Sequence, residues 1–120
     1  MAKVTPKSKA WDALSILWRS KIPYCQKCGT YTHLQVHHAI PKTRGNGIYF
    51  NEENLIVMCR GCHNSLHRRW TDYEKIAFYI SIFGKEQYER LQTSKFYTKK
   101  INKREFKEME ISYKERLNNG

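Results

Sequence analysis

The chain has 120 residues, with 22 Lys and Arg against 11 Asp and Glu, so its formal net charge is +11. This length fits one compact domain and excludes a large multidomain enzyme. No stretch approaches the roughly 18 apolar residues of a membrane-spanning helix, and residues 1–9 lack the apolar core of a secretory signal. We therefore expect a soluble cytoplasmic protein that neither enters a membrane nor is exported. An excess of cations attracts polyphosphate backbones, which makes nucleic acid the expected partner.

The first predicted element is an amphipathic helix over residues 8–20, with Ser8 as its candidate cap. Pro23 ends the helix before the first cysteine, so residues 1–24 form a basic N-terminal helical segment. Its large apolar residues recur at helical spacing: Trp11, Leu14, Leu17 and Trp18.

Two short strands are predicted on either side of a loop. Residues 34–39 alternate between apolar and polar, and Pro41 ends this strand. Residues 42–47 form a loop with two glycines and two cations, and residues 51–54 fit one short helical turn. Residues 55–58 are apolar throughout, which is typical of a buried strand.

Helices are predicted for most of the remaining chain. Residues 62–70 fit one helix, and Thr71 with Glu74 forms a capping box that opens the next. Gly84 is the expected left-handed stop of that second helix. Residues 85–95 are predicted to be helical again.

The last predicted helix begins at Asn102, an N-cap whose capping-box partner is Glu105. Ile101 and Phe106 fit a hydrophobic staple across this start. We expect the C-terminal helical extension, residues 71–120, to pack on the core or on the second subunit of a homodimer. The contact would be an apolar stripe formed by Phe106, Met109, Tyr113 and Leu117.

The four cysteines form two pairs, Cys25-x-x-Cys28 and Cys59-x-x-Cys62. Two such knuckles can place four thiolates around one Zn²⁺. A thioredoxin-like redox pair would need only one such motif in a βαβ context, and two disulfides would need an oxidising compartment. We therefore predict a structural Zn²⁺, which supplies folding free energy to a chain with a small core.

Four histidines accompany these cysteines: His37, His38, His63 and His67. The fifth, His33, is interpreted as an ordinary polar residue. If the two knuckles share one zinc, the end of the first strand and the helix after Cys62 are held side by side. The four imidazoles then lie in one small volume, and three imidazoles with an open position are typical of a catalytic metal.

In their order along the chain, these motifs resemble the HNH (ββα-metal) endonucleases. The segments that carry the resemblance are CQKC, VHHAIP and NEENLIVMCRGCHNSLH, between Cys25 and His67. The resemblance implies an α+β fold, with a small zinc-stapled ββα-metal core at residues 25–70 and flanking α-helices. It also implies a DNA endonuclease with one catalytic divalent metal, Mg²⁺ or Mn²⁺, with Zn²⁺ and Ni²⁺ as alternatives.

The same resemblance assigns roles to single residues. It makes His38 the general base and Asn54 the residue that orients it, with Asn51 as a weaker candidate for the latter role. In some family members the central Asn also ligates the metal and the last His is absent. The implied ligands of the catalytic metal are His37, His63 and His67.

The chemistry independently requires residues of these types. A neutral imidazole accepts a proton from water at neutral pH, and a cation stabilises the charge that develops at the phosphate. We expect hydrolysis to leave 5′-phosphate and 3′-hydroxyl ends. Candidate phosphate contacts are the cations near the motifs: Lys42, Arg44, Arg60, Arg68 and Arg69.

A second, weaker resemblance covers residues 71–92, which are similar to the phage recombination nucleases of the NinG (Rap) family. That family acts on branched DNA. The resemblance implies a phage-encoded enzyme that acts in the host cytoplasm and favours branched or junction DNA. Low sequence specificity is expected for a separate reason, because the sequence shows no helix-turn-helix that could read bases.

Two other functions remain open as alternatives. A non-catalytic, zinc-stabilised DNA-binding module would explain the charge and the cysteines, but not the order of the histidines and Asn54. An adaptor of the RING type is disfavoured, because RING ligation needs eight ligands in alternating order.

Overall fold

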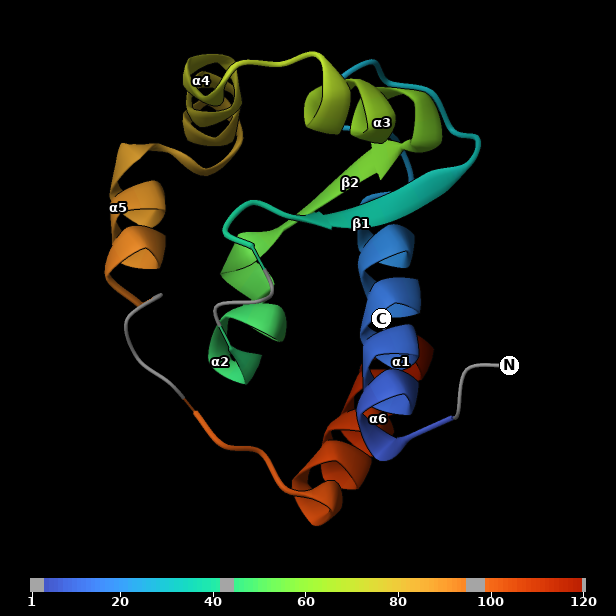
Figure 1. Ribbon diagram of the computed structural model, residues 1–120. Coiled ribbons are helices and arrows are strands. Elements are labelled where there is room, and N and C mark those ends of the chain that lie inside the picture. The colour runs from blue at the N-terminus through green and yellow to red at the C-terminus, as the bar shows by residue number, and fades with distance from the viewer. Residues whose placement is uncertain (1–3, 42–44, 95–98, 120) are drawn as a thin grey trace.

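The computed structural model describes residues 4–41, 45–94 and 99–119. Figure 1 shows a central pair of strands with α3 above it, α1 and α6 along one side and α4 and α5 along the other. Among the described residues, no helix combines the length and apolarity needed to cross a bilayer. The elements are, in chain order, α1 (Pro6–Lys21), β1 (Leu34–His38), α2 (Asn46–Tyr49), the 3₁₀ helix η2 (Glu52–Asn54), β2 (Leu55–Cys59), α3 (Arg60–Arg68), α4 (Asp72–Phe83), α5 (Lys85–Ser94) and α6 (Lys103–Asn119).

The strands β1 and β2 pair antiparallel, so that His37 lies opposite Ile56 and His38 opposite Leu55. Strand β2 leads directly into α3, and the three elements form a ββα unit. The residues of β2 are buried on both faces: Leu55 packs in the α1 and α6 core, and Ile56 packs in the core beside α3 and α4. This burial explains why the strand is apolar throughout rather than alternating. The predicted α+β fold with a ββα core is confirmed.

Helix α1 starts earlier than predicted. Its N-cap is Thr5, and Pro6 occupies the first helical turn, where its missing N–H costs nothing. Ser8 is the third helical residue of a capping box with Thr5: the Ser8 N–H donates to Thr5 Oγ1 at 3.1 Å, and the Thr5 N–H donates to Ser8 Oγ at 2.9 Å. The assignment of Ser8 as the cap was therefore wrong.

Two further helix ends follow local chemistry. The capping box of α4 is confirmed, with the Glu74 N–H donating to Thr71 Oγ1 at 3.1 Å. Gly84 follows α4 with φ 83° and ψ 155°, a positive φ that suits glycine, although its ψ is extended rather than left-handed helical. Helix α3 begins at Arg60, before the predicted start, because Cys59 Sγ caps it by accepting from the Cys62 N–H at 3.4 Å.

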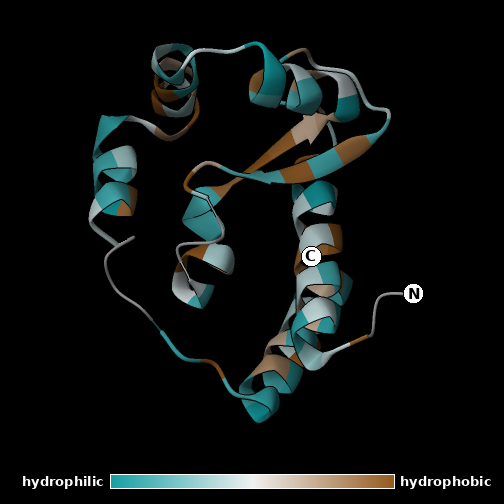
Figure 2. Cartoon of the chain, viewed as in Figure 1, coloured by the Kyte–Doolittle hydropathy of each residue, from teal (hydrophilic) through white to brown (hydrophobic). Residues whose placement is uncertain are grey.

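Helix α6 packs along α1 within the same chain. Phe106 and Tyr113 of its apolar stripe are buried against Leu14 and Leu17 of α1. The predicted cap is present, since the Glu105 N–H donates to Asn102 Oδ1 at 2.8 Å. Figure 2 shows the hydropathy of these elements: β2 is largely brown, which marks hydrophobic residues, whereas the surface helices α5 and α6 carry much teal, which marks hydrophilic ones.

Candidate metal centres and active site

The four cysteines meet at one point beside the sheet. Their sulfur atoms all lie within 4.8 Å of one another, and all four are free thiols. Cys28 Sγ and Cys59 Sγ are 3.7 Å apart. Two thiolates bound tetrahedrally to one Zn²⁺ at about 2.3 Å would lie about 3.8 Å apart, whereas a disulfide bond is only about 2.05 Å long. The cluster therefore fits a structural Zn²⁺ held by Cys25, Cys28, Cys59 and Cys62.

The pKa values of the cysteine thiols favour a bound cation. Burial raises the pKa of the Cys25 thiol, but N–H groups that point at its sulfur outweigh this effect and bring the pKa to about 6. Burial and the three neighbouring sulfurs raise the pKa of the Cys62 thiol. Four thiols this close cannot all ionise without a positive charge among them, and a bound Zn²⁺ would supply that charge.

A second cluster brings together three of the histidines. Nδ1 of His37 lies 3.1 Å from Nε2 of His63, and Nε2 of His67 lies 3.0 Å from the same His63 atom. Two imidazole nitrogens held by one ion at about 2.1 Å would lie roughly 3.0–3.4 Å apart. His37 stands at the end of β1, and the other two project from one face of α3 at i and i+4.

Two of these rings make hydrogen bonds on their far side, and the bond to His63 fixes its tautomer. Nδ1 of His63 lies 2.7 Å from the amide oxygen of Gln35, which only accepts, so this nitrogen carries the proton and the Nε2 lone pair faces the cluster. Nε2 of His37 lies 2.8 Å from the Tyr79 hydroxyl, and a proton on Nε2 leaves the Nδ1 lone pair facing His63. In that tautomer two lone pairs face each other, and a cation between them would relieve their repulsion; in the other tautomer, Nδ1–H of His37 donates to Nε2 of His63.

The electrostatics of the cluster favour a metal over a proton as that cation. Burial, followed by the neighbouring His63 and His67, lowers the pKa of His37 to about 3. Burial and His67 also lower the pKa of His63. Both rings are thus neutral near pH 7, the form that binds metal.

His38 is held outside this cluster by other partners. Its ring stacks on Trp11 of α1, with centroids 4.7 Å apart and an interplanar angle of 28°, and Tyr49 contacts it edge-on. Its Nε2 lies 2.9 Å from the Tyr49 carbonyl oxygen. A carbonyl oxygen only accepts, so Nε2 carries the proton and the lone pair of the neutral ring is on Nδ1.

Asn54 does not bond the ring of His38, which corrects the expectation from the sequence. Its buried amide accepts from the Ile40 N–H at 2.7 Å and donates to the carbonyl oxygens of Ile40 at 2.9 Å and Ile48 at 3.4 Å. The amide thereby ties the end of β1 to α2, the helix whose Tyr49 carbonyl holds His38. Asn51, the weaker candidate, caps η2 by accepting from the Glu53 N–H at 3.0 Å.

Residues 24–69 match the family model described as HNH endonuclease. These residues form an HNH domain. An HNH domain indicates a nuclease or DNA-binding role, with DNA as substrate or partner and with a divalent metal. Searches among curated proteins and among solved structures found no match.

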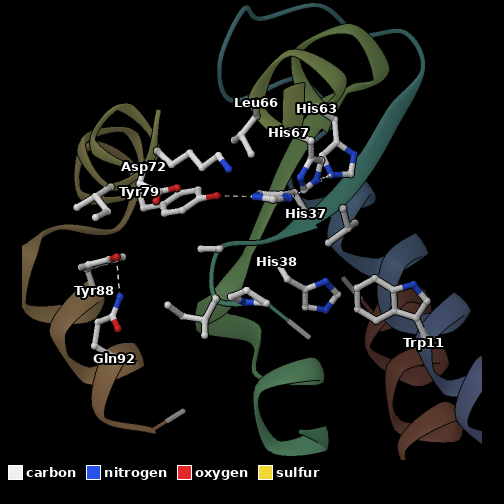
Figure 3. Close-up of a pocket in the computed structure, with 16 residues that line it drawn as sticks. Trp11, His37, His38, His63, Leu66, His67, Asp72, Tyr79, Tyr88 and Gln92 are labelled. Carbon is white, nitrogen blue, oxygen red and sulfur yellow. Dashed lines mark hydrogen bonds between the residues drawn. The ribbon is translucent and has the colours of Figure 1, made fainter. Parts of the chain in front are cut away.

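The four histidines His37, His38, His63 and His67 line a pocket of about 640 Å³. His38 and His63 line the same pocket, so they face one space rather than opposite sides of the molecule. Figure 3 shows the Tyr79 hydroxyl directed at His37, with Tyr88 and Gln92 on the side of the pocket away from Trp11. Helices α4 and α5, which lie beyond the matched segment, therefore contribute one wall.

The cations predicted to contact phosphate lie at both ends of α3. Arg60 begins this helix, Arg68 ends it, and Arg69 is its C-cap; all three are exposed. Lys42 and Arg44 lie outside the described residues.

The sequence analysis missed the residues that support the histidines. Tyr79 and Gln35 lie outside the HNH motifs, and each reaches its histidine from a distant part of the chain. Trp11 was recognised only as an apolar helix residue. Nothing in the sequence indicates that an aromatic residue on the helix before an HNH motif contacts His38, the candidate general base.

Proposed function

We propose that this chain is a metal-dependent HNH endonuclease that hydrolyses phosphodiester bonds of DNA. The observation that carries the proposal is the separation of two kinds of imidazole in one pocket. The three rings of the cluster converge on one point, whereas the His38 ring is held by Trp11 and Tyr49. One group of imidazoles suits metal binding, and the separate imidazole suits proton transfer.

We assign the catalytic metal to His37, His63 and His67. A divalent ion bound there would supply positive charge to a nonbridging phosphate oxygen and to the leaving 3′ oxygen. All three donors are imidazole nitrogens, which suit Zn²⁺ and Ni²⁺ better than Mg²⁺, a cation that prefers oxygen. We therefore favour a transition-metal ion over the Mg²⁺ considered from the sequence.

His38 is the general base in this proposal. Its Nδ1 lone pair takes a proton from water, and the hydroxide oxygen bonds to phosphorus while the bond from phosphorus to O3′ breaks. The O3′ atom takes a proton from solvent, and His38 then releases its proton. The products carry 5′-phosphate and 3′-hydroxyl ends.

Asn54 is a positioning residue. Its amide holds the backbone of Ile40 and Ile48, and the latter adjoins the Tyr49 carbonyl that bonds His38. The base is thus oriented through one turn of α2. Flanking phosphates would lie against the cations at the ends of α3, Arg60, Arg68 and Arg69, with Lys42 and Arg44 as further contacts.

Nicking of supercoiled plasmid tests the proposal. The wild-type protein, loaded with Zn²⁺ at the cysteines, is assayed with added Ni²⁺, Zn²⁺, Mn²⁺ or Mg²⁺. Removal of the base in His38→Ala should slow cleavage by about 10²–10⁴-fold. The variant should still bind the second metal, which isothermal titration calorimetry measures.

Two variants complete the design. His63→Ala should lose both the second metal and cleavage, and His33→Ala, which changes a histidine outside the pocket, should lose neither. DNA binding by the wild-type protein without nicking under any of these metals would contradict the proposal and favour a non-catalytic DNA-binding module. Full activity of His38→Ala would remove this residue as the base.

A further inference from the structure

Beyond the histidines, the pocket is lined by the segment after β1 and by helices α4 and α5. We call this part of the pocket the lateral pocket, and define it by Ile40, Ile76, Tyr79, Tyr88 and Gln92. We propose that the lateral pocket binds an unpaired nucleobase of the DNA strand whose phosphate lies at the histidine cluster. The proposal rests on the proposed nuclease function and adds a substrate class to it.

Size is the first argument. The whole pocket measures about 640 Å³, within the range of about 300–1,000 Å³ that is typical of small-molecule sites. The histidine cluster is compact, because its ligand atoms lie within 4.8 Å of one another. A single metal ion and one phosphate oxygen would fill only a small part of the whole pocket.

The lining is the second argument, because it combines apolar and aromatic surface with a few polar groups. The rings of Tyr79 and Tyr88 lie 6.3 Å apart at an angle of 28°, and the Gln92 amide donates to the Tyr88 hydroxyl at 2.6 Å. Stacking on aromatic rings and hydrogen bonding to amides are how proteins hold unstacked bases. The charged residues that also line the pocket are Lys75, which suits a phosphate, and Asp72.

Continuity with the metal centre is the third argument. Tyr79 lines the lateral pocket and bonds His37 at 2.8 Å, so one side chain separates the base from the reacting phosphate. Ile76, one turn before Tyr79 on α4, also lines the pocket and leaves 41 % of its surface exposed. An apolar side chain at this position would be covered by the occupant.

The base must be unpaired because a concave pocket admits a single base and not a base pair within a stacked duplex. A base enters such a pocket freely when its nucleotide is already single-stranded. A base within a duplex must first leave the stack, and the free-energy cost of this step is least at mismatches, bulges and branches. The lateral pocket thus favours DNA with unpaired nucleotides beside the cleaved bond. Fully paired duplex would bind only through its phosphates.

Binding by DNA that holds one unpaired 2-aminopurine, a fluorescent base, tests this proposal without relying on cleavage. His38→Ala serves as the background, so that the DNA stays intact. We expect affinity for the bulged duplex to exceed that for the matched duplex by roughly 5- to 150-fold, the range for stacking one base on aromatic side chains. Acrylamide should quench the bulged 2-aminopurine less in the complex than in free DNA.

A filling substitution makes the test specific to the pocket. Ile76→Trp places an indole at the pocket and should abolish the preference for the bulge while leaving binding of matched duplex and of metal unchanged. Ile16→Trp on α1, at a site with 47 % exposure outside the pocket, is the matched control and should keep the preference. Ile76→Ala gives a second variant that keeps the fold if the indole does not.

The outcomes separate this inference from the proposed function. Equal affinity for bulged and matched duplex, or a preference that survives Ile76→Trp, overturns the base pocket even if the protein nicks DNA. A preference that depends on Ile76, in a protein that cleaves no DNA, supports the pocket and rejects the nuclease. Self-association that Ile76→Trp abolishes and DNA does not compete with would assign the pocket to a second copy and overturn the proposal.

Discussion

The Tyr79 hydroxyl lies 2.8 Å from Nε2 of His37, and both side chains are buried. Helix α4 therefore reaches the histidine cluster from outside residues 24–69, the segment that matches the HNH model. When Nε2 of His37 donates to this hydroxyl, the Nδ1 lone pair of His37 faces His63. A hydrogen bond on the far nitrogen of a ligand histidine sets its tautomer and raises its basicity.

Removal of this hydroxyl should weaken metal binding. Tyr79→Phe keeps the ring in the core but leaves His37 without its partner, and loss of such a bond typically costs about 10–100-fold in metal affinity. Calorimetric titration with Ni²⁺ or Zn²⁺, after the cysteine site is filled, measures the change. Tyr88→Phe removes the neighbouring hydroxyl, which bonds Gln92, and should leave the affinity unchanged. If Tyr79→Phe and Tyr88→Phe bound the metal with equal affinity, α4 would only pack against the histidine cluster.

The cysteine cluster should hold one Zn²⁺ on which folding depends. Cys28→Ser replaces the exposed member of the cluster with a weaker ligand, and Zn²⁺ binding contributes directly to the folding free energy of such domains. We expect the variant to lose Zn²⁺ in a colorimetric assay and to unfold at a much lower temperature by circular dichroism. Thr32→Ala, at an exposed position of the same loop, should retain both zinc and stability. A variant that lost zinc yet unfolded at the wild-type temperature would reject the structural role.

The parts of the fold that the sequence predicted correctly are those decided by neighbouring residues. Thr71 with Glu74, and Asn102 with Glu105, are capping pairs three residues apart, and both are present. Ser8 misled the prediction because it belongs to such a pair as its second member. Helix α2 was missed because it is a single turn that includes Gly47, and it is held by a buried amide from Asn54 rather than by its own pattern.

In the candidate site, too, the features that could be predicted are those decided by short sequence motifs. The histidine cluster could be predicted because His63 and His67 share a helix face and the cysteine knuckles bring His37 beside them. Tyr79 could not be predicted, because it is separated from His37 by 42 residues and no short motif links them. The contact between Asn54 and the backbone of Ile40 depends on the path of a loop, which residue spacing does not encode.

Stacking by Trp11 should matter for the base and not for the metal. Trp11→Leu keeps an apolar side chain but removes the ring that holds His38, and loss of alignment of this kind can cost about 10- to 100-fold in rate. We expect slower single-turnover cleavage with unchanged metal affinity, and partial rescue in Trp11→Phe. Trp18→Leu, in the α1 and α6 core, is the control for loss of a tryptophan from the same helix. If Trp18→Leu slowed cleavage as much as Trp11→Leu, the effect would come from helix packing.

The arginines at the ends of α3 should make DNA binding sensitive to salt. A cation bound at a phosphate releases counterions, so the logarithm of affinity falls linearly with the logarithm of salt concentration, and each neutralised phosphate adds about one unit to the slope. Arg60→Ala, Arg68→Ala and Arg69→Ala should each flatten that slope by about one. Arg104→Ala on α6, which removes an exposed arginine paired with Glu108, should leave it unchanged. Fluorescence anisotropy over a salt series measures the slopes, and an equal slope in all four variants would remove α3 from the interface.

The ion pair between α6 and η2 should stabilise the fold in a manner that depends on pH. Two guanidinium nitrogens of Arg116 donate to the two carboxylate oxygens of Glu52, at 2.7 and 2.8 Å. This hydrogen bonding lowers the pKa of Glu52 from its ordinary value of about 4.5, although partial burial opposes the shift. A lowered pKa means that the folded state favours the charged carboxylate. The stabilisation is therefore present above the ordinary pKa and is lost as the pH falls below it.

Arg116→Ala should reduce the free energy of unfolding by up to about 1 kcal/mol at pH 7, because both side chains are partly exposed and solvent screens the pair. Urea unfolding at pH 7 and below pH 4 should show this difference from the wild type shrinking as Glu52 gains its proton. The zinc site is common to both proteins, so its own pH dependence cancels in the difference. Glu52→Gln should lose similar stability at pH 7 and show the same convergence at low pH. A difference that stayed constant between the two pH values would mean that Arg116 stabilises α6 through packing on Tyr113 rather than through its charge.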